Sequence, residues 1–266
     1  MLKIASGQRS AIGATMARVA EDLGQFSPLS PDDRDRMQIA GRRFETFNNG
    51  AQIRARIDGS PRAGVILSGW ACEQCILLDG RRQIFSILVS GDPIVMLGDS
   101  APMMRSVVAL TRLEFADLTP IVRYGSPSIG EGAPKAFADA ISQQRNRLFD
   151  HIVRLGRHTA RERIVHLLLE LRDRLELAGL VKAQTFRIPL TQETLADTLG
   201  LSVVHIHRTL QQLRREGLIE LKSGGVTLLK PAQLAAIVEV AEPPTQRVEL
   251  RSKRPFPMAS YSSAIT

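Results

Sequence analysis

The sequence predicts an α+β protein built in three parts: a β-rich N-terminal half, a long helical middle and a C-terminal winged helix-turn-helix. Three observations lead to this prediction. Turn residues break positions 42–118 into short apolar segments, whereas positions 134–178 carry almost no turn residues. Two short amphipathic helices around one glycine, followed by a hairpin pattern, fill positions 190–229.

Composition limits the classes of protein to which the chain can belong. With 44% hydrophobic and 23% charged residues, its 266 residues are typical of a soluble globular protein of one large or two smaller domains. The net charge of +8 favours negatively charged partners without requiring them. The start lacks the apolar core of a signal peptide, and no stretch has the length that spans a bilayer. We therefore expect a cytoplasmic protein with no membrane partner.

The β-rich half consists of apolar segments separated by turns. The turns are NNG at 48–50, DGSPRAG at 58–64, LDGRR at 78–82, SGDP at 90–93 and DSAP at 99–102. The segments between them are too short for average helices, so they predict an all-β sandwich, barrel or roll. Just before this half, Ser30 and Pro31 are the residue types of a helix N-cap and first helical position.

The two cysteines lie close together in the predicted strand GWACEQCILL. Positions three apart on a strand point to opposite faces, so Cys72 and Cys75 are poorly placed to share a disulfide or a metal ion. We expect two buried thiols, with redox sensing as the alternative.

The helical middle carries two apolar stripes, and Gly156 and Thr159 divide them into two helices. The first stripe is narrow, as in a seam between two copies of one helix, and it predicts a homodimer. A helix packed on its own β-rich half is the alternative. The residues expected at the dimer interface are Phe137, Ile141, Gln144, Leu148, Ile152 and Leu155.

The stretch from Leu190 to Ile219 has the signals of a helix-turn-helix. Thr191 and Ser202 are residue types that cap helices, Gly200 permits the tight turn between them, and Gly217 ends the second helix. The second helix is expected to bury Val203 or Val204, together with Ile206, Leu210 and Leu213. The following LIELKSGGVTLL predicts a β-hairpin, the wing of a winged helix-turn-helix.

The polar residues of the second helix suit the major groove of double-stranded DNA, which is about 12 Å wide and admits one helix. A solvated helix face is the alternative for His205 and His207. The residues expected to contact bases are Val203, Val204, His207, Arg208 and Gln211. Those expected to contact the DNA backbone are Thr191, Gln192, Ser202, His205, Lys222 and Ser223.

Several motifs resemble the Crp/Fnr family of bacterial transcription regulators. They are RERIVHLLLELRDRL, IPLTQETLADTLGLSVVHIHRTLQQLRREGLI with its GG wing, SGWACEQCILLDGRRQIFSILVSGDPI and RSVVALT. The resemblance covers residues 27–238. It implies a cupin-like, cyclic-nucleotide-binding-like β-roll as sensor, a long dimerisation helix and a winged helix-turn-helix, with RNA polymerase as a partner of activators.

Two departures from the family pattern bear on the ligands. Val203 and Val204 replace an Arg and a Glu that many members use for readout, so we expect a different operator. Val95 and Met96 stand where cyclic-nucleotide-binding members have Gly-Glu, although Arg105 and Ser106 remain as an anion-binding pair. These four residues are the expected effector pocket, and cyclic nucleotide is not expected there. Two cysteines cannot supply the four thiolates of an iron–sulfur centre, and we expect no cofactor and no metal site.

The sequence therefore predicts a homodimeric, sequence-specific DNA-binding transcription regulator that reads a near-palindromic site. The alternative is a small-molecule sensor or enzyme whose winged helix docks proteins, but the chain shows no nucleophile–base pair, carboxylate dyad or Gly-rich phosphate loop. The expected parts are an extension at 1–25, the β-roll at 26–129, the dimerisation helix at 130–158, the DNA-binding domain at 159–240 and a disordered tail at 241–266.

Overall fold

The β-rich half forms two antiparallel sheets that enclose an apolar core. The computed structural model describes residues 6–54, 61–96, 105–122 and 132–238. Within these residues, one four-stranded sheet has the order β1-β8-β3-β6 and the other the order β2-β7-β4-β5. Side chains from both sheets, among them Ile66, Leu88 and Phe115, meet in a common core. The first sheet consists of β1 (Phe44–Phe47), β8 (Leu113–Asp117), β3 (Arg62–Ser68) and β6 (Pro93–Met96). The second consists of β2 (Gln52–Ile53), β7 (Arg105–Ala109), β4 (Ala71–Ile76) and β5 (Arg82–Leu88).

Both cysteines lie in β4 and are buried and free, as expected. A register shift between Glu73 and Gln74 interrupts the alternation of faces along this strand. Burial raises the pKa of the Cys72 thiol to about 11, which keeps it protonated and unreactive at neutral pH.

Three helices pack against the sheet that contains β3 and β8: α1 (Ser6–Phe26), α2 (Pro31–Gly41) and α3 (Thr119–Val122). Ser30 caps α2 through a capping box with Asp33, and Pro31 begins the helix, as the sequence predicts. The long helix α1 was not predicted. It buries Met16, Val19, Ala20 and Leu23, whose spacing of i, i+3, i+4 and i+7 marks one helix face.

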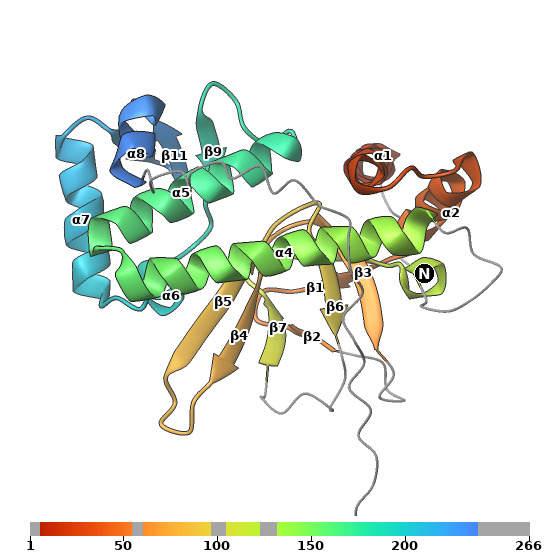
Figure 1. Cartoon of the computed structure of the whole chain (residues 1–266), viewed down its shortest axis with the longest axis horizontal. Coiled ribbons are helices and arrows are strands. Elements are labelled where there is room, and N and C mark those ends of the chain that lie inside the picture. Colours follow the sequence, from red (N-terminus) through yellow and green to blue (C-terminus); the bar gives the residue numbers. More distant parts are fainter. Residues whose placement is uncertain (1–5, 55–60, 97–104, 123–131, 239–266) are drawn as a thin grey trace, which may run out of the picture.

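The helical middle divides where the sequence predicts. The first helix, α4 (Gly132–Arg157), ends two residues before the N-cap Thr159 of α5 (Ala160–Leu177). A capping box between Thr159 and Glu162 fixes this start. In Figure 1, α4 crosses in front of the sheets, with α1 and α2 near one end and the C-terminal helices near the other.

The C-terminal part is a winged helix-turn-helix. Thr191 caps α6, Gly200 adopts the left-handed conformation at φ 60°, and Ser202 caps α7, as predicted. The wing pairs β10 with β11 and adds β9, a strand that was not predicted. The elements are β9 (Thr185–Arg187), α6 (Gln192–Leu199), α7 (Val203–Arg215), β10 (Ile219–Lys222), β11 (Gly225–Leu228) and α8 (Pro231–Val238).

The helix-turn-helix is packed directly on the β-roll. Trp70, just before β4, and Ile84 and Ile87 of β5 belong to the same buried cluster as the apolar side chains of α5, α6 and α7. The helix α6 lies against β5. The apolar core is therefore continuous from the sheet into the DNA-binding part.

Across the described residues, no helix is long and apolar enough to cross a membrane. The expectation of a disordered tail at 241–266 lies outside the described residues.

Candidate nucleic-acid interface

The helix α7 presents one face to solvent and buries the other. Val203, Val204, His207 and Arg208 are exposed, and Gln211 is half-buried. Their spacing along the helix places these five side chains on a common side. All five residues expected to contact bases are thus on the solvent face.

The opposite face of α7 is held by the core of the helix-turn-helix. Ile206, Leu210 and Leu213 are buried there, as predicted. The expectation that Val203 or Val204 is also buried is wrong, since they are 40% and 63% exposed. Both lie in the first turn of α7, ahead of the first core contact at Ile206. Two exposed valines at a helix start are free to contact another molecule.

Arg208 is the exposed cation at the centre of this face. Within the described part of the chain, no hydrogen bond or ion pair engages its guanidinium, and the same holds for Lys222 in the wing. By contrast, Arg161 pairs with Glu216 at 2.7 Å near the end of α7. An exposed guanidinium can donate two parallel hydrogen bonds to guanine O6 and N7.

The residues expected to contact the DNA backbone surround the same face. Thr191, Gln192, Ser202 and His205 are exposed at the starts of α6 and α7. The Ser202 Oγ accepts from the backbone N–H of His205 at 3.2 Å. Gln192 Nε2 lies 3.3 Å from His207 Nδ1, which joins α6 to α7 across the turn.

The wing carries the other two residues expected at the DNA backbone. Lys222 and Ser223 are exposed at its tip, where Ser223 (φ 51°) and Gly224 (φ 74°) form the turn. A side chain is rarely found at such a φ, and here the tight hairpin between β10 and β11 requires it.

The helix α4 divides the residues expected at the dimer interface into two groups. Phe137 is buried in the chain's own core, and Ile141 packs against that core. Gln144 is half-buried beside a cavity, and Leu155 lies against the turn at Gly200. The assignment of Phe137 to a dimer seam is therefore wrong. The cause is α1, whose apolar face covers the N-terminal half of α4.

The C-terminal half of α4 leaves apolar side chains uncovered. Leu148 and Ile152 are exposed, as a dimer seam requires, and Phe149 and Val153 extend the apolar surface beside them. These four residues, here called the α4 patch, occupy consecutive turns. Phe149 and Val153 were not predicted at the interface, although the pairs 148–149 and 152–153 repeat at a spacing of four.

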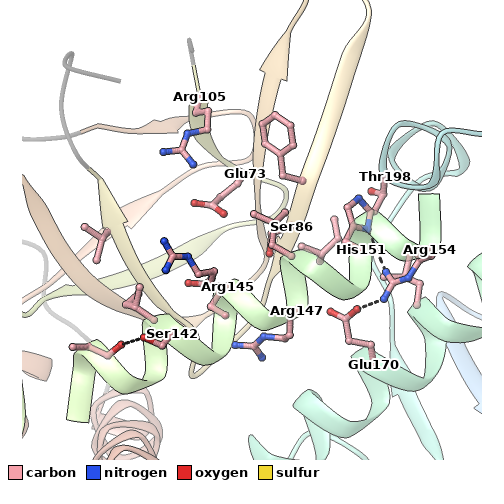
Figure 2. A pocket seen from close by; sticks show the side chains of 18 residues that line it. Glu73, Ser86, Arg105, Ser142, Arg145, Arg147, His151, Arg154, Glu170 and Thr198 are labelled. Atoms are coloured by element: carbon pink, nitrogen blue, oxygen red, sulfur yellow. Dashed lines mark hydrogen bonds and ion pairs between the residues drawn. The ribbon is translucent and has the colours of Figure 1, made fainter. Parts of the chain in front are cut away.

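A cavity of about 540 Å³ lies between the β-roll and α4 and reaches α5 and α6. Val95 and Arg105 of the expected effector pocket line it. Met96 and Ser106 do not line it, and Met96 is buried in the core between the sheets. Figure 2 shows Glu73 and Arg105 on the sheet side of the cavity and Arg145 and Arg147 on α4.

Buried charges at the cavity have shifted protonation equilibria. Burial raises the pKa of Glu73 above its usual range, against the lowering effect of Arg105. Burial would also raise the pKa of Glu170, yet the guanidinium groups of Arg174 and Arg154 lower it. Burial and the charge of Arg154 lower the pKa of His151 to about 4, so this imidazole is neutral at pH 7.

Comparisons with known proteins find matches both for the C-terminal part and for most of the chain. The family model of the Crp-like helix-turn-helix domain matches residues 162–237. The nitrogen fixation regulation protein FixK of Bradyrhizobium diazoefficiens is 32% identical over 215 residues, which cover 79% of this chain and 88% of FixK. The chain belongs to the Crp/Fnr family of transcription regulators.

Other Crp/Fnr regulators agree with this assignment. The transcriptional activatory protein AadR of Rhodopseudomonas palustris is 30% identical over 176 residues, covering 65% of this chain and 71% of AadR. The solved structure of FixK2 from Bradyrhizobium japonicum has the same fold, with a TM-score of 0.62 at 23% identity over 75% of this chain and 98% of that one. TTHB099 from Thermus thermophilus has a TM-score of 0.55 at 22% identity, over 73% and 96%.

The family assignment decides the class of function. The chain is a DNA-binding transcription regulator, and its relatives are regulators and not enzymes. The alternative of an enzyme or sensor with a protein-docking winged helix is not favoured. The predicted arrangement of β-roll, long helix and winged helix-turn-helix is confirmed.

Proposed function

We propose that two copies of this chain bind one near-palindromic DNA site, each inserting α7 into a major groove. The single observation that carries this proposal is the exposed face of α7, which combines Arg208 with apolar and hydrogen-bonding side chains. A helix with such a face, joined to a wing, fits the groove geometry of helix-turn-helix proteins.

The proposed roles follow from the chemistry of each side chain. Arg208 donates to a guanine, while Val203 and Val204 contact thymine methyl groups. His207 and Gln211 donate to or accept from neighbouring base edges. Thr191, Gln192, Ser202, His205, Lys222 and Ser223 contact phosphates and fix the register of the protein on DNA.

We propose the α4 patch as the interface between the two copies. Leu148, Phe149, Ile152 and Val153 are all at least one-third exposed on the described chain, and contiguous exposed apolar side chains mark interaction sites. The helical repeat suits pairing with the same helix of a second copy about a two-fold axis. RNA polymerase is the proposed further partner at promoters where the protein activates transcription.

The proposed effector site is the cavity between the β-roll and α4, with Val95 and Arg105 in its wall. The Glu of the Gly-Glu pair of cyclic-nucleotide-binding members is replaced here by Met96, which is buried outside the cavity. The proposed ligand is therefore a different small molecule.

Arg208→Ala tests the proposed reading of DNA. We expect it to weaken binding to the preferred site by about 1–3 kcal/mol and to relax the preference at one base pair. Fluorescence anisotropy with a set of single-base variants of the site measures both effects. Arg215→Ala removes an exposed arginine from the end of the same helix and should change affinity equally for every sequence. If Arg208→Ala also acts equally on every sequence, Arg208 contacts phosphate and the assignment is wrong.

A further inference from the structure

A buried arginine of the DNA-binding part contacts the β-roll through one nitrogen of its guanidinium group. Arg174, on α5, donates from Nη2 to the carbonyl oxygen of Ile87 at 2.6 Å and forms an ion pair with Asp92 in the turn after β5. Its Nη1 donates to Glu170 at 2.9 Å. Arg174 and Asp92 are 8% and 5% exposed, so this pair is shielded from solvent.

Asp92 is held in place by further contacts from its own turn and from α4. Its Oδ2 accepts from the backbone N–H of Val89 at 2.6 Å, and its Oδ1 lies 3.6 Å from Nη1 of Arg147. Glu170, in turn, accepts from Arg154 of α4. The network therefore joins the sheet, α4 and α5 at one point.

A second ion pair joins the β-roll to the helix-turn-helix itself. Arg82 Nε on β5 lies 2.7 Å from Asp197 Oδ2 on α6, and both side chains are about one-third exposed. The helix α6 precedes α7 by three residues and shares its core. A rotation of α6 on β5 would therefore move the recognition helix.

The two ion pairs specify one orientation of α5 and α6 on the sheet, which apolar contacts alone do not. Apolar packing is non-directional, so it holds α5 and α6 against the sheet without fixing one orientation strongly. A guanidinium bound to two or three acceptors requires one geometry. Buried ion pairs often add little net stability, and their best-attested use is to specify a single arrangement.

We propose that Arg174–Asp92 and Arg82–Asp197 are positioning contacts for DNA recognition. They fix the orientation of α7 relative to α4, and in a dimer paired through α4 they fix the separation of the two recognition helices. The inference rests on the proposed dimeric reading of two half-sites. Its consequence is that these residues, which lie away from the DNA face, set how strictly the half-site spacing is read.

The test uses the full chain and duplexes with two copies of the preferred half-site, whose spacing is changed by one or two base pairs. We expect the wild type to prefer one spacing by about tenfold or more. Arg174→Gln and Asp92→Asn should each reduce this preference to about threefold or less, while affinity for a duplex with one half-site stays unchanged. The double variant should be no worse than Arg174→Gln alone, because the two residues form one contact.

Two further variants make the outcome decisive. Arg172→Gln removes the same charge from the same helix, where Arg172 pairs with its neighbour Asp173, and it should keep the wild-type preference. Asp197→Asn breaks the partly exposed pair, costs little stability, and should weaken the preference even where an Arg174 variant fails to fold.

The failures of the two proposals are distinguishable. A wild type with no preferred spacing contradicts the dimeric reading. A wild-type preference that Asp197→Asn and the folded Asp92 and Arg174 variants all retain overturns the positioning role alone.

Discussion

Charged side chains are paired within the chain on one side of the helix-turn-helix and exposed to solvent on the other. Where α5 and α6 meet the β-roll, Arg174 pairs with Asp92 of the β-roll, and Asp197 pairs with Arg82. All four side chains are buried or half-buried. On the solvent side of α7, Arg208 is exposed and pairs with no group in the described residues. The difference indicates that the paired charges hold parts of the protein together, whereas Arg208 is available to an external anion such as DNA.

Substitutions on the two sides of α7 should differ most in their effect on the free energy of unfolding. Leu213→Ala removes a fully buried side chain from the core side of α7 and should lower the free energy of unfolding by about 2–5 kcal/mol. Val204→Ala, on the solvent side of the same helix, should change it by no more than about 0.5 kcal/mol. Urea unfolding at pH 7 measures both. Equal losses would show that the two sides are not distinct.

A smaller effect is expected on assembly. Ile152→Glu places a charge in the α4 patch and should shift the dimer to monomer, with a dimer dissociation constant raised about 100-fold, equivalent to about 3 kcal/mol. Sedimentation velocity over a concentration series measures this change. Leu180→Glu alters a similarly exposed apolar side chain outside the patch and should leave the dimer intact. A dimer that persists in Ile152→Glu would move the interface elsewhere.

The buried His151 of α4 should make the free energy of unfolding depend on pH. The pKa of His151 is lowered to about 4 by burial and by Arg154, from an ordinary value of 6.5. Between these values the unfolded chain binds a proton that the folded chain does not, so stability falls as pH drops from 7 to 5. The His151 contribution to this loss is about 2 kcal/mol.

His151→Gln should remove that part of the loss, leaving a flatter profile in urea unfolding measured at pH 7 and pH 5. Burial also lowers the pKa of His166. The pH profile of His166→Gln, measured in the same way, is therefore the matched comparison for His151→Gln. An unchanged slope in His151→Gln would place the origin of the pH dependence in other residues.

The smallest expected effect concerns the cavity. Cyclic AMP at a concentration of about 1 mM should produce no detectable heat of binding and no change in DNA affinity, because Met96 replaces the Glu of the Gly-Glu pair and lies outside the cavity. Isothermal titration and anisotropy test this directly. Saturable binding with a dissociation constant in the micromolar range would contradict the expectation.

Local signals in the sequence were sufficient for the elements that carry the DNA face. Thr191, Gly200 and Ser202 define α6, the turn and α7 through interactions with residues three or four positions away. The same is true of Ser30 and the start of α2. Such short-range rules are readable without any knowledge of the tertiary structure.

Features that depend on distant residues were not predictable in the same way. The burial of Phe137 depends on α1, more than a hundred positions earlier, and the pair Arg174–Asp92 joins residues 82 positions apart. Neither the burial of Phe137 nor the pair Arg174–Asp92 leaves a pattern among residues that are close in the sequence. One of Val203 and Val204 was expected to be buried because an apolar residue type was taken as a sign of burial, although surface contacts also use such residues.

Selection of bound sequences from a random oligonucleotide pool tests whether two symmetry-related copies of α7 read the DNA. We expect the full chain to enrich a near-palindromic motif with two half-sites whose centres lie about 34 Å, or one helical turn, apart. We also expect Arg208→Ala to lose preference at one symmetric pair of positions in that motif. Recovery of a single asymmetric half-site, or of no motif above background, would contradict the reading of DNA by two symmetry-related copies of α7.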